Sequence, residues 1–190
     1  MKKSIIIGAG GIGSFTAHHL DRLIDLNQIK DMSFDCYDDD KVELKNILYQ
    51  NFVSSDIGSY KTSALEFRYL NLKFITKRIK LDDLNKYDLV VLCADNNIIR
   101  REAYENYVQN KIPFIDSRAN GKTIGIFSSD TENYLDTIDE STGSFSCQNP
   151  FQIDKKEIEY GNVIVAAALA QCILNYSRYN KLPNDMILNF

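Results

Sequence analysis

The residues from position 8 to position 13 have a spacing that could hold a phosphate group. They fit the pattern G-x-G-x-x-G through Gly8, Gly10 and Gly13, and Gly11 adds a further glycine. Glycines let backbone N–H groups approach a phosphate, and the positive end of a following helix favours its negative charge. Such a loop fits NAD, FAD or ATP, so it indicates a nucleotide without choosing among the three. A tight turn without a ligand is the alternative.

Charged residues farther along the chain could complete this site. Asp38 or Asp40 is placed to accept hydrogen bonds from a ribose, because both follow an apolar run that predicts a strand. Asp95 follows another such run and could coordinate Mg²⁺, which prefers oxygen ligands. Lys61 could neutralise phosphate charge, although no GKT or GKS triplet follows the glycine loop, which excludes a Walker-type site. The alternatives are a solvated acidic turn, a helix cap for Asp95 and a surface lysine.

These residues need a scaffold that brings the ends of several strands together. Apolar runs predict strands at 3–7, 33–37, 74–79, 89–93 and 113–116, and apolar periodicity predicts helices from residue 12 and at 59–70, 97–110 and 163–179. The alternation predicts an α/β fold with a Rossmann-like, doubly wound, mostly parallel sheet. Residues 122–127 are expected to extend the sheet as an antiparallel hairpin, ahead of a long polar excursion at 128–159. Ligands bind outside the carboxyl ends of such strands, where all the candidate residues would collect.

Size and charge exclude several classes of function. A chain of 190 residues and 21.7 kDa fits one domain over residues 1–190. Its 22 basic and 26 acidic residues give a formal charge of −4, so we expect neither a nucleic-acid footprint nor an anionic-membrane footprint. Apolar runs fall far short of the roughly 20 residues that a membrane helix needs.

The cysteines point to a reducing compartment. Cys36, Cys93, Cys147 and Cys172 are widely scattered, and two of them lie inside apolar, strand-like runs. We therefore expect a cytoplasmic protein. No CxxC pair occurs and the chain has 2 histidines, so no zinc site is expected.

Four ordered motifs resemble those of the ubiquitin-activating-enzyme-like superfamily, typified by ThiF and MoeB. Residues 38–50 are similar to its signature D-x-D-x-V-x-x-S-N-L-x-R-Q, with matches at Asp38, Asp40, Val42, Asn46 and Gln50. The glycine loop with its following serine looks like G-x-G-G-x-G-S. Residues 56–62 resemble D-V-G-x-x-K-A, and residues 92–96 resemble the C-T-D-N segment.

The resemblance implies an adenylyltransferase. The family binds ATP and Mg²⁺ and adenylates the C-terminal carboxylate of a small ubiquitin-like protein or a peptide. By resemblance, Asp40 would hold the ribose, Asn46 and Lys61 would face the phosphates, and Asp95 would bind Mg²⁺, with Gln50 in the same nucleotide-binding set. The substrate carboxylate is already ionised at neutral pH, so this chemistry needs positioning and charge neutralisation more than a general base.

Two positions depart from, or extend, the family pattern. Tyr49 stands where the family has arginine, which removes a cation expected on the triphosphate; Arg100, Arg101 or Arg118 could substitute, or each could be a solvated or turn residue. Cys147 lies where several relatives carry a cysteine. It is either a thiol that accepts the acyl group as a thioester or an unreactive loop thiol.

The apolar helix at 163–179 predicts a homodimer, because it is more hydrophobic than the surface helix of a monomer and members of the family usually pair. The alternative is that this helix packs on the sheet of its own chain.

Two further functions remain open. A non-catalytic ATP- or partner-binding subunit is motivated by Tyr49 and the short chain, and an NAD-dependent oxidoreductase by the glycine loop with Asp38.

Overall fold

The computed structural model describes residues 1–138, 148 and 150–190 and contains one mixed sheet of seven strands in the order β3-β2-β1-β4-β5-β6-β7. The strands are β1 (Lys2–Ile7), β2 (Met32–Tyr37), β3 (Lys73–Ile75), β4 (Leu89–Leu92), β5 (Phe114–Asn120), β6 (Thr123–Ser128) and β7 (Met186–Asn189). The first five are joined by parallel pairings, whereas β5–β6 and β6–β7 pair antiparallel. The predicted Rossmann-like sheet with an antiparallel C-terminal extension is therefore confirmed.

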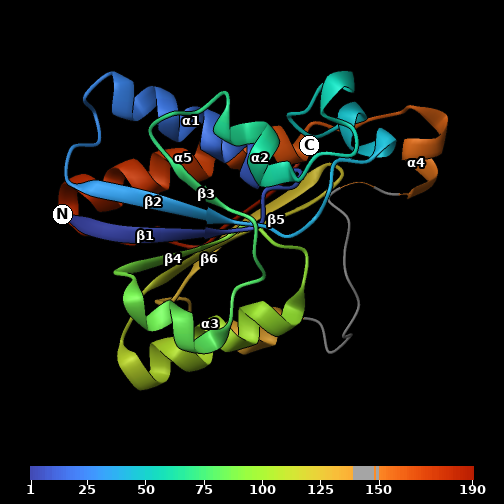
Figure 1. Ribbon diagram of the computed structural model, residues 1–190. Helices are drawn as coiled ribbons and strands as arrows, with labels where there is room; N and C mark the ends of the chain where they lie inside the picture. The colour runs from blue at the N-terminus through green and yellow to red at the C-terminus, as the bar shows by residue number, and fades with distance from the viewer. Residues whose placement is uncertain (139–147, 149) are drawn as a thin grey trace.

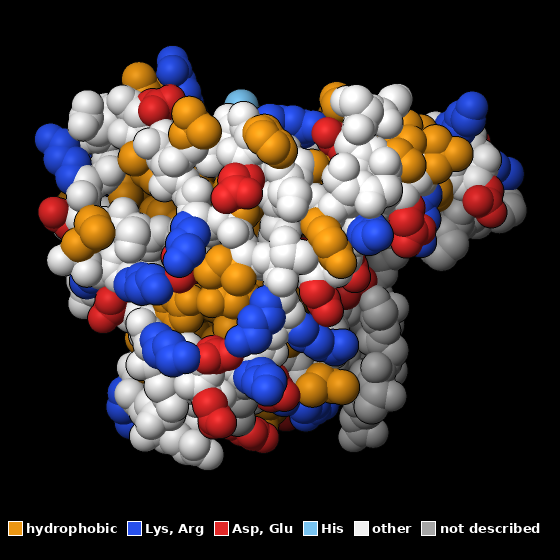
Figure 2. Space-filling view, viewed as in Figure 1, with side chains coloured by type: hydrophobic (Ala, Val, Ile, Leu, Met, Phe, Trp, Pro, Cys, Tyr) orange, Lys and Arg blue, Asp and Glu red, His pale blue; other side chains and the backbone are white. Residues whose placement is uncertain are grey.

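Helices cover both faces of the sheet (Figure 1). The helices α1 (Gly13–Asp25), α2 (Lys61–Glu66) and α5 (Gly161–Tyr179) lie on one face, and α3 (Asn97–Asn110) lies on the other; a short α4 spans Pro150–Lys155. Short 3-10 helices span Leu44–Leu48, Ser54–Asp56, Leu81–Lys86 and Tyr134–Thr137. Figure 2 shows apolar side chains between the upper layer and α3, bordered by lysines, arginines and acidic residues.

The strand β4 is buried along its whole length because both faces of the sheet are covered. Alternate residues face opposite sides: Val91 belongs to the apolar cluster under α1 and α5, and Val90 to the cluster under α3. The continuous apolar run at this strand thus reflects its central place between β1 and β5. This arrangement fixes the carboxyl ends of β1 and β4 side by side.

The helix α5 packs within the chain, against α1, β5 and β6. Val165, Leu169 and Ile173 on its inner side are fully buried. Its first residue, Gly161, lies so close to the β5–β6 turn that an added Cβ would meet the Gly121 carbonyl oxygen at 2.1 Å. Because the sheet of its own chain accounts for the apolar character of α5, this helix no longer argues for a dimer.

Several elements differ from the sequence prediction. The helix predicted at 59–70 ends at Glu66, because Phe67 and Leu70 are 88% and 85% exposed and do not continue the buried stripe. The strand predicted at 74–79 ends at Ile75, after which the chain leaves the sheet edge. β7 was not predicted. In addition, none of the described helices combines the length and the apolar character needed to cross a membrane.

Candidate active site

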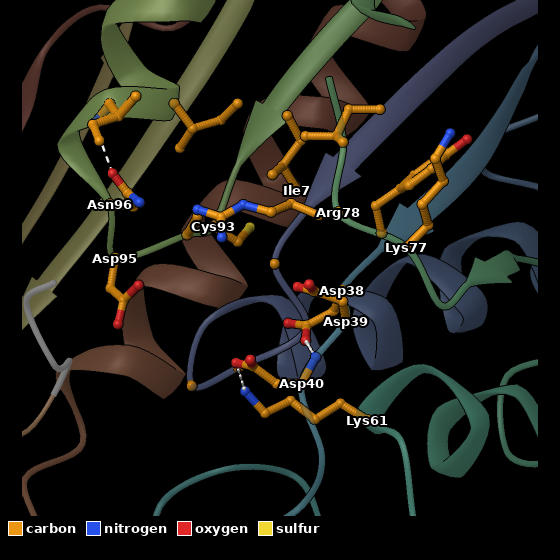
Figure 3. A pocket seen from close by; sticks show the side chains of 18 of the residues that line it. Ile7, Asp38, Asp39, Asp40, Lys61, Lys77, Arg78, Cys93, Asp95 and Asn96 are labelled. Carbon is orange, nitrogen blue, oxygen red and sulfur yellow. Dashed lines mark hydrogen bonds and ion pairs between the residues drawn. The ribbon is translucent and has the colours of Figure 1, made fainter. Parts of the chain in front are cut away.

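A cavity of about 400 Å³ opens at the carboxyl ends of β1, β2 and β4 (Figure 3). Its volume lies in the range of small-molecule sites. Most of the residues predicted to bind a nucleotide line it: Gly8, Gly10, Gly11, Asp38, Asp40, Gln50, Lys61 and Asp95. Segments that are distant in the sequence therefore meet at this edge of the sheet, as the fold predicts.

The glycines of the loop fill two different roles. Gly8 has a φ of +98°, and a Cβ on Gly13 would lie 1.9 Å from the Gly8 carbonyl oxygen. These two residues let the turn close, and Gly13 does not line the cavity. Gly10 differs, since a Cβ there would meet only the Gln50 amide at 3.9 Å. The lack of a side chain at Gly10 therefore leaves space in the cavity, and the fold does not require glycine there.

Asp38 holds the glycine loop to the end of β2. Its carboxylate accepts the backbone N–H of Ala9 at 2.7 Å and that of Asp40 at 2.8 Å. Burial raises the pKa of Asp38, and the charge of Lys61 and these two hydrogen bonds oppose that rise only in part. Each carboxylate oxygen thus accepts a backbone N–H, so Asp38 stabilises the conformation of the glycine loop.

Lys61 places a buried cation on the cavity wall. It begins α2, its side chain is 9% exposed, and its Nζ lies 2.7 Å from Oδ2 of the exposed Asp40. Its backbone N–H also donates to the Asp40 carbonyl at 2.9 Å. Burial alone would lower the pKa of Lys61, but the charge of Asp38 and the hydrogen bond to Asp40 outweigh it and raise the pKa. The ammonium group is therefore charged at neutral pH.

Gln50 and Asn46 differ although the same motif contains both. Gln50 is 9% exposed and lines the cavity, and its buried Oε1 has no hydrogen-bond partner among the described residues. Asn46 is buried away from the lining, inside the 3-10 helix Leu44–Leu48, where its Oδ1 accepts the Glu43 N–H at 2.8 Å and caps the N-terminus of that helix. Gln50 is thus a polar group that a ligand could satisfy, while the Asn46 oxygen is engaged by the chain itself.

Tyr49 lines the cavity beside Gln50 and is tied to the glycine loop through α5. Asn162 donates from Nδ2 to the Tyr49 carbonyl at 2.6 Å and to the Gly11 carbonyl at 3.0 Å. Its Oδ1 accepts from Nε2 of the buried Gln148 at 3.2 Å. Sequence reasoning missed this brace, since a lone asparagine in an apolar helix gives no signal of its partners. Cys147 lies outside the described residues.

Asp95 is exposed at the cavity, across from the Asp38–Asp40 turn (Figure 3). The helix cap is its neighbour Asn96, whose Oδ1 accepts the Ile98 N–H at 2.7 Å. The cap alternative for Asp95 is therefore wrong. Within the described part of the chain, no group of three or more His, Cys, Asp and Glu side chains could hold a metal by itself.

The arginines proposed to replace the missing family arginine do not line the cavity. Arg100 contacts both oxygens of the buried Asp116, at 3.0 and 3.2 Å, and Arg118 contacts the same carboxylate at 2.7 Å. Arg101 lines a separate groove on α3. The basic residues at the cavity, besides Lys61, are Lys77 and Arg78, which follow β3. Their signal in the sequence was a basic pair directly after a strand, obscured because that strand was predicted too long.

The model of the ThiF family matches residues 1–184, nearly the whole chain. The chain belongs to the ThiF family. Its motifs at the glycine loop, at 38–50, at 56–62 and at 92–96 are therefore those of a ThiF-family domain, as the sequence predicted. No curated protein sequence matches this family member at a significant level.

Solved structures share the fold of this ThiF-family chain. The microcin C7 biosynthetic enzyme MccB in complex with N-formylated MccA superposes with a TM-score of 0.71 at 18% identity, covering 100% of this chain and 62% of MccB. E. coli MccB with ATP gives 0.67 at 20% identity, covering 100% and 60% of the two chains. PaaA gives 0.68 at 16% identity, covering 100% and 61%. The chain thus spans about three fifths of the length of these structural neighbours.

Proposed function

We propose that this ThiF-family protein is an ATP-dependent adenylyltransferase that activates the C-terminal carboxylate of a peptide or a small ubiquitin-like protein. The observation that carries the proposal is the buried, charged Lys61 on the wall of the glycine-loop cavity. The space beside Gly10 and the unpartnered Oε1 of Gln50 fit a polar ligand in the same place. MccB, which shares the fold, has been solved with ATP and with the peptide MccA, and this favours a peptide substrate.

The reaction joins a carboxylate oxygen of the substrate to the α-phosphorus of ATP and breaks the bond to the β-phosphate oxygen. Pyrophosphate leaves, and the acyl-adenylate forms without a proton transfer. Lys61 neutralises charge on the phosphates, the glycine loop orients them through its backbone N–H groups, and Asp40 turns from Lys61 to the ribose. These roles need fixed charges and backbone dipoles, which the chain provides without a catalytic histidine.

Mg²⁺ is proposed to be held by Asp95 together with the phosphates of the nucleotide. One protein carboxylate is enough for this arrangement, because Mg²⁺ keeps several waters and is usually completed by substrate phosphates. The exposed position of Asp95 across from the Asp38–Asp40 turn fits such a role. When bound, the ion supplies further charge compensation at the phosphates.

Two observations bear on the rival functions. Asp38, the residue that motivates an NAD-dependent oxidoreductase, accepts two backbone N–H groups, which leaves it poorly placed to read the ribose hydroxyls of NAD. Tyr49 brings no charge to the cavity wall, which favours the second candidate function, an ATP- or partner-binding subunit without catalysis. The variant Tyr49→Arg separates the two candidates that bind ATP: it raises the rate of an enzyme that lacks a cation and leaves a non-catalytic subunit inactive.

A homodimer in the cytoplasm completes the proposal. The exposed apolar side chains of Leu44, Leu48 and Val53 lie in the segment just before Lys61 and fit a subunit interface next to the site. Among the described residues, Cys36 and Cys172 form no disulfide, which is consistent with the proposed reducing compartment. Light scattering that finds only a 21.7 kDa species at tens of micromolar would contradict the dimer.

Exchange between ATP and labelled pyrophosphate tests the proposed activity. The assay uses peptides and small proteins encoded next to the gene, each with a free C-terminus and, as a matched control, with an amidated C-terminus. We expect exchange with the free carboxylate alone, and its loss in Asp95→Ala. Exchange that is equal for both forms of the substrate would contradict adenylation of the C-terminus. A wild type and a Tyr49→Arg variant that both stay inactive while binding ATP would favour the non-catalytic subunit.

A further inference from the structure

Arg78 extends into the cavity as a cation that lacks a close partner. It follows β3, and Figure 3 shows its side chain reaching over the cavity, with its guanidinium group directed toward Cys93. Within residues 1–138, 148 and 150–190 it makes no hydrogen bond or ion pair. The adjacent Lys77 differs, because its Nζ lies 3.6 Å from Asp83. The orientation of Arg78 is therefore not explained by an ion pair within the fold.

Apolar side chains form part of the cavity wall. Ile7, Ile79, Ile99 and the ring of Tyr37 line the cavity. Figure 3 places Ile7, Cys93 and Arg78 at one end of the cavity and the Asp40–Lys61 pair at the other. An apolar end suits an aromatic base, whereas the end with Lys61 and the glycine loop suits phosphates.

The carboxylate of Glu102 lines the same cavity as Arg78. Glu102 lies on α3, one turn after Ile98 and Ile99. Burial and then the charge of Glu105 raise the pKa of Glu102, and the positive charge of Arg78 opposes that rise. The charges of Glu102 and Arg78 thus interact across the cavity without a short ion pair among the described residues.

We propose that Arg78 is a specificity-determining residue whose planar guanidinium group stacks on the purine base of the bound nucleotide. The inference rests on the proposed ATP site and adds to it a residue that closes the base-binding end. A guanidinium plane packs well against an aromatic face, and a lysine ammonium does not reproduce that planar contact. The competing role for Arg78 is a charge contact with the phosphates, in place of the arginine that Tyr49 replaces.

Binding measurements on three variants separate these roles. Calorimetry gives the Kd of ATP for the wild type, Arg78→Ala, Arg78→Lys and the control Lys80→Ala, at low and high salt. Lys80 is an exposed lysine of the same segment that does not line the cavity. Adenosine is measured on the same proteins as a competitor of a fluorescent ATP analogue. Stacking predicts that Arg78→Ala and Arg78→Lys each weaken ATP and adenosine roughly tenfold, with little salt dependence. Lys80→Ala should stay within about twofold of the wild type.

Other results overturn the inference. Arg78 would be assigned to the phosphates if three results occurred together. Arg78→Ala would weaken ATP but Arg78→Lys would not, adenosine affinity would stay unchanged, and the effect on ATP would shrink at high salt. Unchanged ATP affinity in Arg78→Ala would remove Arg78 from the site. A wild type that binds no ATP would instead refute the proposed function itself, so the two failures are distinguishable. Thermal unfolding of each variant checks that it folds. Because Arg78 is exposed, its substitution should leave the unfolding temperature unchanged.

Discussion

Lys61 and Asp40 form an ion pair at the cavity, with Nζ and Oδ2 2.7 Å apart. The family pattern assigns these groups to different parts of ATP, the phosphates and the ribose. In the structure their charges neutralise each other, and the backbone N–H of Lys61 also donates to the Asp40 carbonyl. The ion pair thus keeps the buried ammonium group charged. In the proposed function, phosphate oxygens of ATP replace the Asp40 carboxylate at Lys61.

Replacing Lys61 by alanine should suppress catalysis severely. Loss of one preorganised charge contact of this kind typically costs on the order of 10²–10³ in rate, and we expect Lys61→Ala to lower pyrophosphate exchange by about that factor. The matched control is Lys45→Ala, since Lys45 is exposed in the same region and pairs with Glu43 rather than with a cavity residue. If exchange survives Lys61→Ala at the rate of Lys45→Ala, the mechanism is refuted.

The glycines of the loop should respond in opposite ways to substitution. Gly10→Val places its side chain at the cavity wall, so the fold should remain while ATP affinity falls at least about tenfold. Gly13→Ala forces a Cβ against the Gly8 carbonyl oxygen and should cost about 3 kcal/mol of the free energy of unfolding, or prevent folding. Thermal unfolding and ATP calorimetry on both variants check this. A stable Gly13→Ala would contradict the close approach of Gly13 to the Gly8 carbonyl oxygen, and a Gly10→Val that binds ATP normally would show that ATP does not bind beside Gly10.

Sequence patterns sufficed where backbone geometry alone determines structure. The glycine loop, the central strand β4 and the turn at Asp38 lie where the pattern placed them, because parallel strands must align their carboxyl ends. The roles of individual polar groups could not be read this way. Asp38 and Asn46 both accept backbone N–H groups. Which N–H groups lie within reach of each side chain depends on the tertiary fold.

The errors in the elements have the same origin. Phe67 and Leu70 continue an apolar period in the sequence, but no element of the fold covers them. β7 is short and exposed, and it pairs only with β6, so its period is weak and its place depends on a distant partner. Arg78 was missed because it lies in irregular chain, where spacing carries no information on direction.

Arg100 should prove structural rather than catalytic. It is 5% exposed and contacts Asp116, which has no exposure of its own, so Arg100→Ala leaves a buried carboxylate with one arginine fewer. We expect a loss of about 3 kcal/mol in the free energy of unfolding, measured by urea denaturation. Arg101→Ala is the neighbouring control and should change the same quantity by less than about 0.5 kcal/mol. Equal stabilities of the two variants would contradict this assignment.

Tyr134, whose hydroxyl donates to the Asp116 carboxylate at 2.9 Å, should make the fold sensitive to alkali. Burial, followed by the charge of Asp116, raises the pKa of Tyr134 above its ordinary value of 10.0. Above pH 10 the phenol of the unfolded chain ionises while that of the folded chain stays protonated, so the folded state binds more protons. The free energy of unfolding should therefore fall as pH rises beyond 10, by up to about 1.4 kcal/mol per pH unit from this group.

Urea unfolding between pH 8 and roughly pH 11 checks this dependence, the limits being set by the ordinary tyrosine pKa. Tyr134→Phe keeps the ring in the core and removes the ionising group, so its stability should fall less steeply than that of the wild type. Other tyrosines with raised pKa values, such as Tyr69 and Tyr176, contribute equally to both proteins. Identical slopes in the two proteins would show that Tyr134 ionises in the folded state.

Calorimetric titration of the wild type with ATP and Mg²⁺, compared with NAD under the same conditions, tests the central claim most directly. Because Lys61 offers a cation to phosphates and Asp38 is occupied by the backbone, the cavity should bind ATP and should bind NAD at least about tenfold more weakly. The ATP signal should disappear in Gly10→Val. Preferential binding of NAD, or ATP binding that Gly10→Val leaves intact, would contradict the assignment of this cavity to an adenylyltransferase.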